Sequence, residues 1–240
     1  MYIISEREEN NMRVKVTNLQ KSYKDRDILK DISFTIKSGT ICGLLGVNGA
    51  GKSTIMKILF GLEKPSSGNI LFDEKTPQEI KKSDEKLGAL IESPAIYMNL
   101  SAFENLKTRA LLYDIPDSKI KETLALIGLA DTGRKKAGKF SLGMKQRLGI
   151  GMAIITNPEF LILDEPTNGL DPDGIQELLE LITSLKRQGM TILISSHQLH
   201  EISQVADDIM ILHNGEIRYN QPNHHQDLGN LFFTIVHGGH

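Results

Sequence analysis

The stretch "GLLGVNGAGKST", residues 43–54, decides the fold of this chain. From Gly46 to Ser53 it follows the pattern G-x-x-x-x-G-K-S, in which glycines let backbone N–H groups approach an anion without a clash from a Cβ atom. The apolar run "TICGLL" that leads into the loop is typical of a buried strand, and apolar residues after it recur at helical spacing. A strand, a glycine-rich loop and the positive end of a helix together bind the phosphates of nucleotides. The stretch therefore predicts an α/β fold with a nucleotide site.

The positions of this loop have distinct expected roles. Lys52 is expected to bring a cation to the β- and γ-phosphates, and the hydroxyl of Ser53 is expected to bind magnesium. The alternative is a glycine-rich turn with an incidental lysine, which the preceding strand and the following helix disfavour. The other residues expected to surround the nucleotide are Gly46, Val47, Asn48, Gly49, Ala50, Gly51 and Thr54.

Acidic residues follow a second apolar run. "FLILDEP", residues 160–166, places Asp164 and Glu165 at the carboxyl end of a buried strand, which is the edge of an open α/β sheet where ligands bind. Asp164 is a predicted magnesium ligand, and Glu165 is a predicted general base for a water near the γ-phosphate. His197 follows the next apolar run, "MTILISS", and is expected to reach that phosphate from the same edge.

The pattern along the chain changes several times. Strand-like segments fill residues 12–42, a mostly helical segment spans about 84–157, and strands alternate with helices from residue 158 onward. Asn214-Gly215 indicates a hairpin turn in this last part. Residues 1–11 are expected to form a loose tail. Residues 221–240 are expected to form a short C-terminal tail, whose apolar "NLFFTIV" packs onto the body.

The composition narrows the class of protein. The 240 residues carry a net charge of −2, which gives no electrostatic case for a nucleic-acid partner. The single cysteine, Cys42, lies in an apolar run and is expected to be a buried hydrophobe in a reducing compartment. No apolar run of the sequence reaches the roughly 18 residues needed to cross a bilayer.

Further motifs complete a family pattern. "FSLGM", residues 140–144, is similar to the LSGGQ signature of ABC transporters, "NGLD" with Asp171 to their D-loop, and Tyr23 to the aromatic that stacks on adenine. The phosphate loop, the "DEP" acids and His197 keep the family's motif order, so residues 12–220 resemble the nucleotide-binding domain of ABC transporters. The residues of the signature segment are Ser141, Leu142, Gly143, Met144, Lys145 and Gln146.

The resemblance implies a fold and a mechanism. The fold is a P-loop NTPase with an ABC-type antiparallel β subdomain and a helical signature subdomain, here about residues 84–157. Two such domains pair head to tail, and Ser141 and Gly143 of one contact the γ-phosphate of ATP held by the other. ATP and Mg²⁺ are the implied ligands, with Lys52, Glu165 and His197 as catalytic residues.

The resemblance also implies an export function. The chain is similar to the bacitracin-resistance and lantibiotic-immunity ATPases, which predicts ATP hydrolysis coupled to export of a lantibiotic, a bacteriocin or another antimicrobial peptide. The expected partners are separate transmembrane permease subunits and a second copy or a related ATPase, at the cytoplasmic face of the membrane. The alternatives are a soluble ABC-type ATPase acting on DNA or ribosomes, and a scaffold that does not hydrolyse nucleotide. The sequence has no heptad arrays or second phosphate loop, and it contains Glu165 and His197, so both alternatives are disfavoured.

Glu92, in "LIESP", departs from the family pattern. A carboxylate at the end of an apolar run is costly to bury without a partner. The resemblance places Glu92 at the Q-loop, where the family has a glutamine between the nucleotide and the permease, and where the lantibiotic-immunity group has glutamate. Glu92 is therefore expected to be a coupling residue and a magnesium ligand. The alternative is a charge at the end of a strand with a structural partner.

Overall fold

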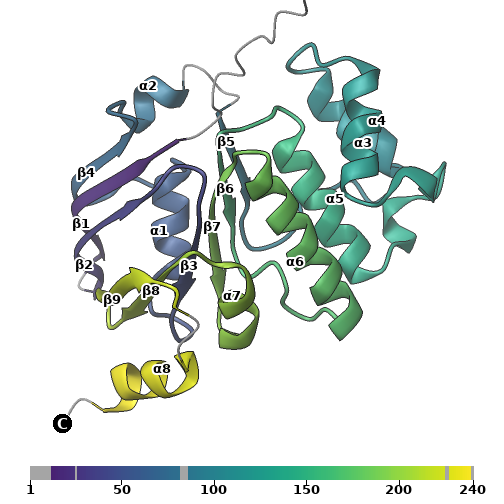
Figure 1. Ribbon diagram of the computed structural model, residues 1–240. Helices are drawn as coiled ribbons and strands as arrows, with labels where there is room; N and C mark the ends of the chain where they lie inside the picture. The colour runs from purple at the N-terminus through teal and green to yellow at the C-terminus, as the bar shows by residue number, and fades with distance from the viewer. Residues whose placement is uncertain (1–11, 25, 82–85, 225–226, 239–240) are drawn as a thin grey trace, which may run out of the picture.

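Two β-sheets and the helices around them make up the computed structural model, which describes residues 12–24, 26–81, 86–224 and 227–238 (Figure 1). In chain order the elements are β1 (Val14–Tyr23), β2 (Arg26–Ile36), β3 (Ile41–Leu45), α1 (Lys52–Leu59), β4 (Ser67–Phe72), α2 (Pro77–Lys81), β5 (Leu87–Leu90), α3 (Ala102–Ala110), α4 (Asp117–Leu126), the 3₁₀ turns η1 (Ala130–Thr132) and η2 (Ala137–Lys139), α5 (Leu142–Ile154), β6 (Phe160–Leu163), α6 (Pro172–Arg187), β7 (Thr191–Ser196), α7 (Leu199–Val205), β8 (Asp208–His213), β9 (Glu216–Pro222) and α8 (Leu228–His237). One sheet has the strand order β2-β1-β4 and the other β5-β6-β7-β3-β8-β9.

The larger sheet places the predicted phosphate loop near its centre. Its neighbouring strands run parallel, except for the antiparallel pair β8 and β9. β3 lies between β7 and β8, so the loop after Leu45 leaves the middle of the sheet. Leu45 pairs with Ser196 of β7, and Leu163 of β6 pairs with Ile194 of β7. The residues that follow β3, β6 and β7 therefore meet at one edge.

The antiparallel sheet covers one face of the larger sheet, and α1 lies between the two (Figure 1). Strand β1 alternates, with Val14 and Val16 buried and Lys15 and Thr17 exposed, so one side of the strand faces this layer. Across the layer, the fully buried rings of Phe72 in β4 and Phe160 in β6 lie 6.0 Å apart. The strands predicted in residues 12–42 are confirmed.

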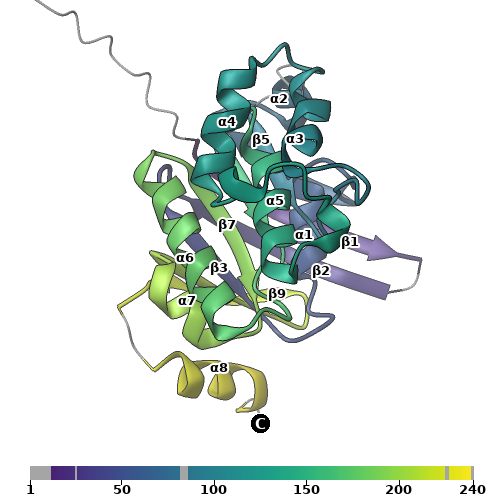
Figure 2. The ribbon, with the colours of Figure 1, turned by 90° about the vertical axis from the view of Figure 1, so that its right-hand side faces the viewer.

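Helices α5 and α6 lie on the opposite face of the larger sheet, and α3 and α4 pack against α5 (Figure 2). Helix α3 begins with a capping box, in which the Ser101 hydroxyl accepts from Glu104 N and the Glu104 carboxylate accepts from Ser101 N. The segment expected to be mostly helical from about residue 84 also contains a strand, because β5 lies beside β6 in the parallel sheet. The helices of this segment, α3 to α5, span residues 102–154.

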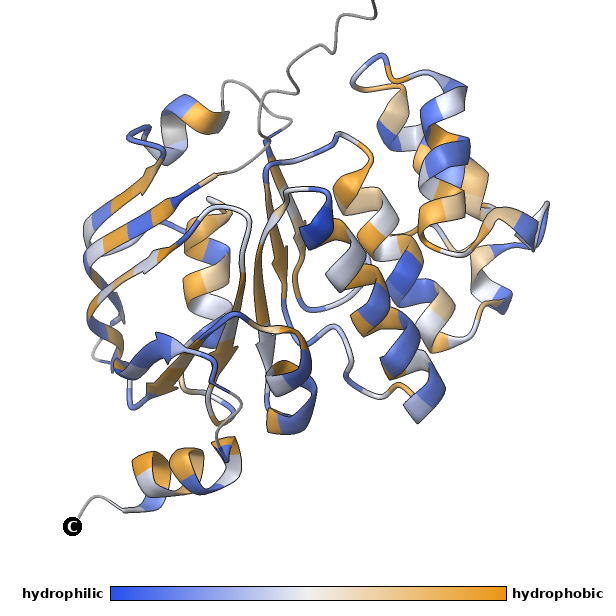
Figure 3. Cartoon of the chain, viewed as in Figure 1, coloured by the Kyte–Doolittle hydropathy of each residue, from blue (hydrophilic) through white to orange (hydrophobic). Residues whose placement is uncertain are grey.

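The C-terminal part is more ordered than a tail. Asn214 and Gly215 have φ values of 51° and 79°, which is the geometry of the predicted hairpin turn. Strand β9 continues to Pro222, and α8 packs its apolar side onto the body, where Leu228 is buried (Figure 3). Residues 1–11, expected to be a tail, lie outside the described part. Within the described part, no helix combines the length and the apolar character needed to cross a membrane.

Cys42 behaves as the sequence predicts. Its side chain is 2% exposed in the layer between the two sheets, and burial raises the pKa of the thiol far above its ordinary value. A thiol held protonated in an apolar core is not a reactive group.

Candidate nucleotide-binding site

The loop between β3 and α1 has the backbone shape of an anion site. Gly49 and Gly51 have φ values of 79° and 110°, a region that favours glycine. A Cβ atom at Gly51 would lie 2.7 Å from Cδ2 of Leu29, so a larger residue does not fit. No side chain caps the start of α1, whose first amides therefore remain available to an anion.

Lys52 is held inside the site by the loop itself. The side chain is 6% exposed, and its Nζ donates to the carbonyl oxygen of Gly46 at 2.7 Å. The same Nζ lies 3.2 Å from Oε1 of Glu165, so the two charges compensate each other. A buried ammonium with partners on both sides is fixed in position for a phosphate oxygen.

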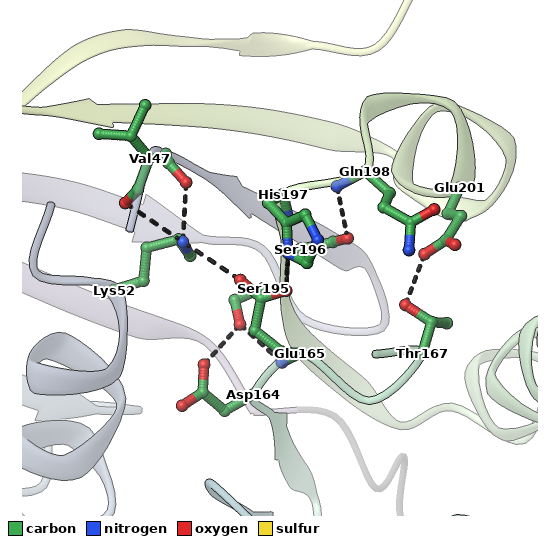
Figure 4. A network of polar contacts seen from close by, with 11 residues as sticks. Val47, Lys52, Asp164, Glu165, Thr167, Ser195, Ser196, His197, Gln198 and Glu201 are labelled. Carbon is green, nitrogen blue, oxygen red and sulfur yellow. Dashed lines mark hydrogen bonds and ion pairs between the residues drawn. The ribbon is translucent and has the colours of Figure 1, made fainter. Parts of the chain in front are cut away.

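A hydroxyl in β7 links the two acidic residues that follow β6. Asp164 is 5% exposed and accepts a hydrogen bond from Ser195 Oγ at 2.6 Å. The same Oγ accepts from the backbone N–H of Glu165 at 2.9 Å. Ser195 therefore orients both acids (Figure 4). Sequence reasoning missed it, because a serine in an apolar strand resembles any other core position.

Glu165 lies between Lys52 and His197 (Figure 4). Its Oε2 is 2.6 Å from Nδ1 of His197 and also accepts from the backbone N–H of His197 at 3.3 Å. Glu165 has a φ of 48°, an uncommon value for a residue with a side chain. Strained backbone of this kind is found where the surrounding structure holds a side chain in a required direction.

These residues share one cavity of about 390 Å³. Its wall contains Tyr23, half exposed, whose hydroxyl donates to Glu63 and whose ring has Lys21 Nζ 4.6 Å from its centre. The hydrogen bond to Glu63 raises the pKa of the Tyr23 phenol. The full lining is Tyr23, Arg26, Ile28, Val47, Asn48, Gly49, Gly51, Lys52, Ser53, Thr54, Glu165, Asn168 and His197.

Three of the lining residues were not expected from the sequence. Arg26 and Ile28 lie in β2, where Arg26 pairs with Tyr23 across the hairpin. Asn168 follows Glu165 by three residues, and its N–H donates to the Glu165 carbonyl at 3.1 Å. The only sequence signal for Arg26 and Ile28 is their closeness to Tyr23. Gly46, Ala50 and Asp164 lie outside the cavity wall.

The signature segment and the D-loop lie together, away from this cavity. Ser141 caps α5 by accepting from Met144 N at 3.2 Å, and Asp171 caps α6 by accepting from Gly174 N at 3.1 Å. A Cβ atom at Gly143 would lie 3.9 Å from Cδ2 of Leu170, so the two segments are neighbours. None of the six signature residues, nor Asp171, is part of the described cavity wall.

The structure corrects the expected burial of Glu92. Its side chain is 67% exposed, and its Oε1 accepts from Lys57 Nζ, on α1, at 2.6 Å. This hydrogen bond lowers the pKa of Glu92 and raises that of Lys57. In the described part of the chain Glu92 makes no hydrogen bond or ion pair with Ser53 or Asp164 and does not line the cavity.

The oxygen donors of the site fit Mg²⁺, which nucleotide phosphates also ligate, better than they fit a metal ion ligated by protein side chains alone. Among the described residues no cluster of three or more His, Cys, Asp or Glu side chains could hold an ion. Ser53 offers a hydroxyl in the cavity wall, and the buried Asp164 offers a carboxylate next to Glu165. Mg²⁺ is commonly held by one or two such oxygen ligands together with substrate phosphates.

Comparison with known proteins identifies the family. The profile of the ABC transporter family matches residues 29–168. The chain is 48% identical to the lantibiotic transport ATP-binding protein SrtF of Streptococcus pyogenes, over 85% of this chain and 88% of SrtF. It is 46% identical to the bacitracin transport ATP-binding protein BcrA of Bacillus licheniformis, over 85% and 68%. The solved structure of cbiO1 from Clostridium perfringens, part of the ABC transporter complex cbiONQ, superposes with a TM-score of 0.81 and 30% identity, over 91% of each chain. The chain therefore belongs to the ABC transporter family, as an ATP-binding subunit that hydrolyses ATP.

Proposed function

We propose that this chain drives the export of a lantibiotic or another antimicrobial peptide. The similarity to transport proteins for a lantibiotic and for bacitracin, over 85% of the chain, favours this class of cargo. The observation that carries the hydrolytic part is Glu165, fixed between Lys52 and His197 beside the phosphate loop. A soluble ABC-type ATPase without a transport role is not favoured.

Nucleotide binding is assigned to the loop and its neighbours. The residues from Val47 to Thr54 apart from Ala50 line the cavity around the phosphates, Lys52 pairs with the β- and γ-phosphates, and the Tyr23 ring stacks on the base. Ser53 and Asp164 are the residues that would hold Mg²⁺, which neutralises charge on the phosphates when bound. Ser195 keeps the Asp164 carboxylate in one orientation through its 2.6 Å hydrogen bond.

Hydrolysis is assigned to Glu165 and His197. The Glu165 carboxylate accepts the proton of the water that attacks the γ-phosphate. Lys52 and His197 hold this carboxylate from opposite sides, which reduces the reorganisation needed during the reaction. His197 is 45% exposed on its side chain, so its ring can donate to the γ-phosphate oxygens from the open side of the cavity.

The site is completed by a second ATPase domain in a head-to-tail pair. Ser141 and Gly143 lie outside the cavity of their own chain, and Leu142 beside them is 45% exposed. At the start of α5 a partner's Ser141 and neighbouring amides would offer hydrogen-bond donors to the γ-phosphate. Asp171 lies next to this segment and belongs to the same contact surface.

Membrane permease subunits are the second kind of partner, at the cytoplasmic face of the membrane. A second groove, of about 220 Å³, runs between the end of α1, β5, α3 and α5, and its wall includes Ile91 and Ser93 on either side of Glu92. Through Lys57, Glu92 joins this groove to α1, which begins at the phosphate loop. We assign the groove to a permease segment and Glu92 to coupling.

Hydrolysis by the purified chain tests this proposal at the level of chemistry. Glu165→Gln removes the proton acceptor but keeps the shape, so ATP hydrolysis is expected to fall at least about a hundredfold. The affinity for ATP is expected to stay within about twofold of wild type, since the phosphate loop is unchanged. Glu180→Gln, an exposed carboxylate on α6, is the matched control. Full activity of Glu165→Gln would contradict the assignment.

The cargo is tested in cells. Deletion of the gene is expected to increase sensitivity to lantibiotics or to bacitracin, and the wild-type gene but not Glu165→Gln is expected to restore resistance. Unchanged sensitivity to both peptide classes would contradict the proposed cargo while leaving the ATPase assignment intact.

A further inference from the structure

A buried carboxylate lies behind the reacting groups. Glu201, on α7, is 5% exposed, and its Oε2 accepts a hydrogen bond from Thr167 Oγ1 at 2.5 Å. Thr167 is itself 2% exposed. The other carboxylate oxygen, Oε1, is buried without a partner among the described residues. Burying a carboxylate with one oxygen unpaired costs free energy, so the position of Glu201 calls for an explanation.

The two residues of this hydrogen bond belong to the two segments that carry the reacting groups. Thr167 follows Glu165 by two residues, and Glu201, on α7, follows His197 by four residues. The segments are therefore joined by the bonds of Ser195 to Asp164 and Glu165, by the exposed contact between Glu165 and His197, and by the buried hydrogen bond between Thr167 and Glu201 (Figure 4).

Helix α7 is a firm support for this contact. Ile202, next to Glu201, is fully buried against β3. A Cβ atom at Gly43 of β3 would lie 2.3 Å from Cγ2 of Ile202, so the glycine allows the helix to approach the sheet closely. Asn223 Nδ2 donates to the carbonyl oxygens of Ser203 and Ala206 at 3.0 and 2.8 Å, which holds the end of α7.

The loop from Glu165 to Asp171 is a chain of turns with Thr167 near its middle. Asn168 N donates to the Glu165 carbonyl, and Leu170 N donates to the Thr167 carbonyl, each at 3.1 Å. Movement of Thr167 would therefore displace Glu165 and Asn168 on one side, and Leu170 and the cap of α6 on the other. Among the described residues, Thr167 is the residue in the middle of this loop whose side chain bonds to α7, and its partner there is Glu201.

We propose that Glu201 is a positioning residue for hydrolysis, which acts through Thr167 to hold Glu165 against His197. This inference rests on the proposed roles of Glu165 and His197. The contact between those two is partly open to solvent and involves flexible side chains. The buried hydrogen bond between Thr167 and Glu201 fixes the backbone on which they stand.

The alternative is a buried hydrogen bond that contributes to stability alone. The two readings differ in kinetics, because a positioning residue changes kcat with little change in the affinity for ATP. Thr123 supplies the matched control. It is 3% exposed on α4, its Oγ1 donates to the Lys119 carbonyl at 2.9 Å, and it is not part of the nucleotide cavity wall.

The experiment compares Thr167→Val with Thr123→Val in the purified full chain. Each change removes one buried hydroxyl at nearly constant volume. Thr167→Val is expected to lower kcat about tenfold with the Kd for ATP within about twofold, whereas Thr123→Val changes only Tm. Thr167→Ser, which keeps the hydroxyl, is expected to retain activity within about threefold of wild type.

The Glu201 variants give an independent second measurement. Glu201→Gln keeps an acceptor for Thr167 and is expected to be more active than Glu201→Ala. If the two residues act as a unit, Thr167→Val combined with Glu201→Ala is no slower than the slower single variant. Unchanged kcat in Thr167→Val and Glu201→Ala, or single effects that multiply in the double variant, would overturn the inference. Full activity of Glu165→Gln would instead overturn the proposed function.

Discussion

At the scale of single residues, the contacts of Glu92 bear on its two expected roles, as a magnesium ligand and as a coupling residue. Among the described residues, Lys57 is the only partner of the Glu92 side chain in a hydrogen bond or ion pair, and Glu92 lies outside the wall of the nucleotide cavity. We therefore expect Glu92→Ala to leave unchanged the Mg²⁺ concentration that gives half-maximal hydrolysis, whereas Asp164→Asn raises it. Export is expected to fall in Glu92→Ala and to recover in part when Lys57→Glu is combined with Glu92→Lys. A raised Mg²⁺ requirement in Glu92→Ala would restore the role of metal ligand.

The residue scale also separates what the sequence predicts well from what it does not. The phosphate loop could be predicted, because its glycines, Lys52 and Ser53 are adjacent in the chain and each type has a specific task. The contacts of Ser195 and Glu201 could not, because each depends on a partner about 30 residues away in sequence. The exposure of Glu92 depends on Lys57 in the same way.

At the scale of elements, the capping box of α3 makes the free energy of unfolding depend on pH. The N–H of Ser101, together with Lys136, lowers the pKa of Glu104 from 4.5 to about 2. A lowered carboxyl pKa adds stability that is complete above the ordinary value of 4.5 and is lost as pH falls toward about 2. Glu104→Gln is therefore expected to lower Tm at neutral pH, with a smaller difference near pH 3. Glu122→Gln, an exposed carboxylate on α4, serves as control, and an equal Tm difference at both pH values would contradict the prediction.

The helices and strands differ in how well the sequence pattern alone predicts them. Helix α6 carries a regular apolar stripe and a cap at Asp171, and it lies in the part of the chain where the sequence predicts alternating strands and helices. The sequence pattern assigns strand β5 to the helical segment, since four residues are too short to show a period. Its Gly88 lowers strand propensity, yet a Cβ there would lie 2.5 Å from the Ala153 carbonyl of α5. The glycine is needed for helix packing, which the local sequence does not reveal.

At the scale of the whole molecule, the phosphate loop and the signature segment belong to different surfaces of one chain. The cavity wall contains residues 47–54 apart from Ala50, while Leu142 at the start of α5 is exposed beside the loop of Asp171. An exposed leucine at a site meant to contact a nucleotide phosphate is explained if a second domain covers it. ATP bound at one chain's loop would then be the bridge between two copies.

Slow hydrolysis should make this pair visible. Glu165→Gln with Mg²⁺ and ATP is expected to shift from monomer to dimer in size-exclusion chromatography with light scattering, because ATP is bound but not consumed. Adding Leu142→Glu places a charge at the contact and is expected to abolish the dimer, with the monomer's affinity for ATP unchanged. Leu111→Glu, at an exposed leucine after α3, is the matched control and should leave the dimer intact. A monomer at saturating ATP, or equal loss of the dimer in both leucine variants, would contradict a head-to-tail homodimer built on this surface.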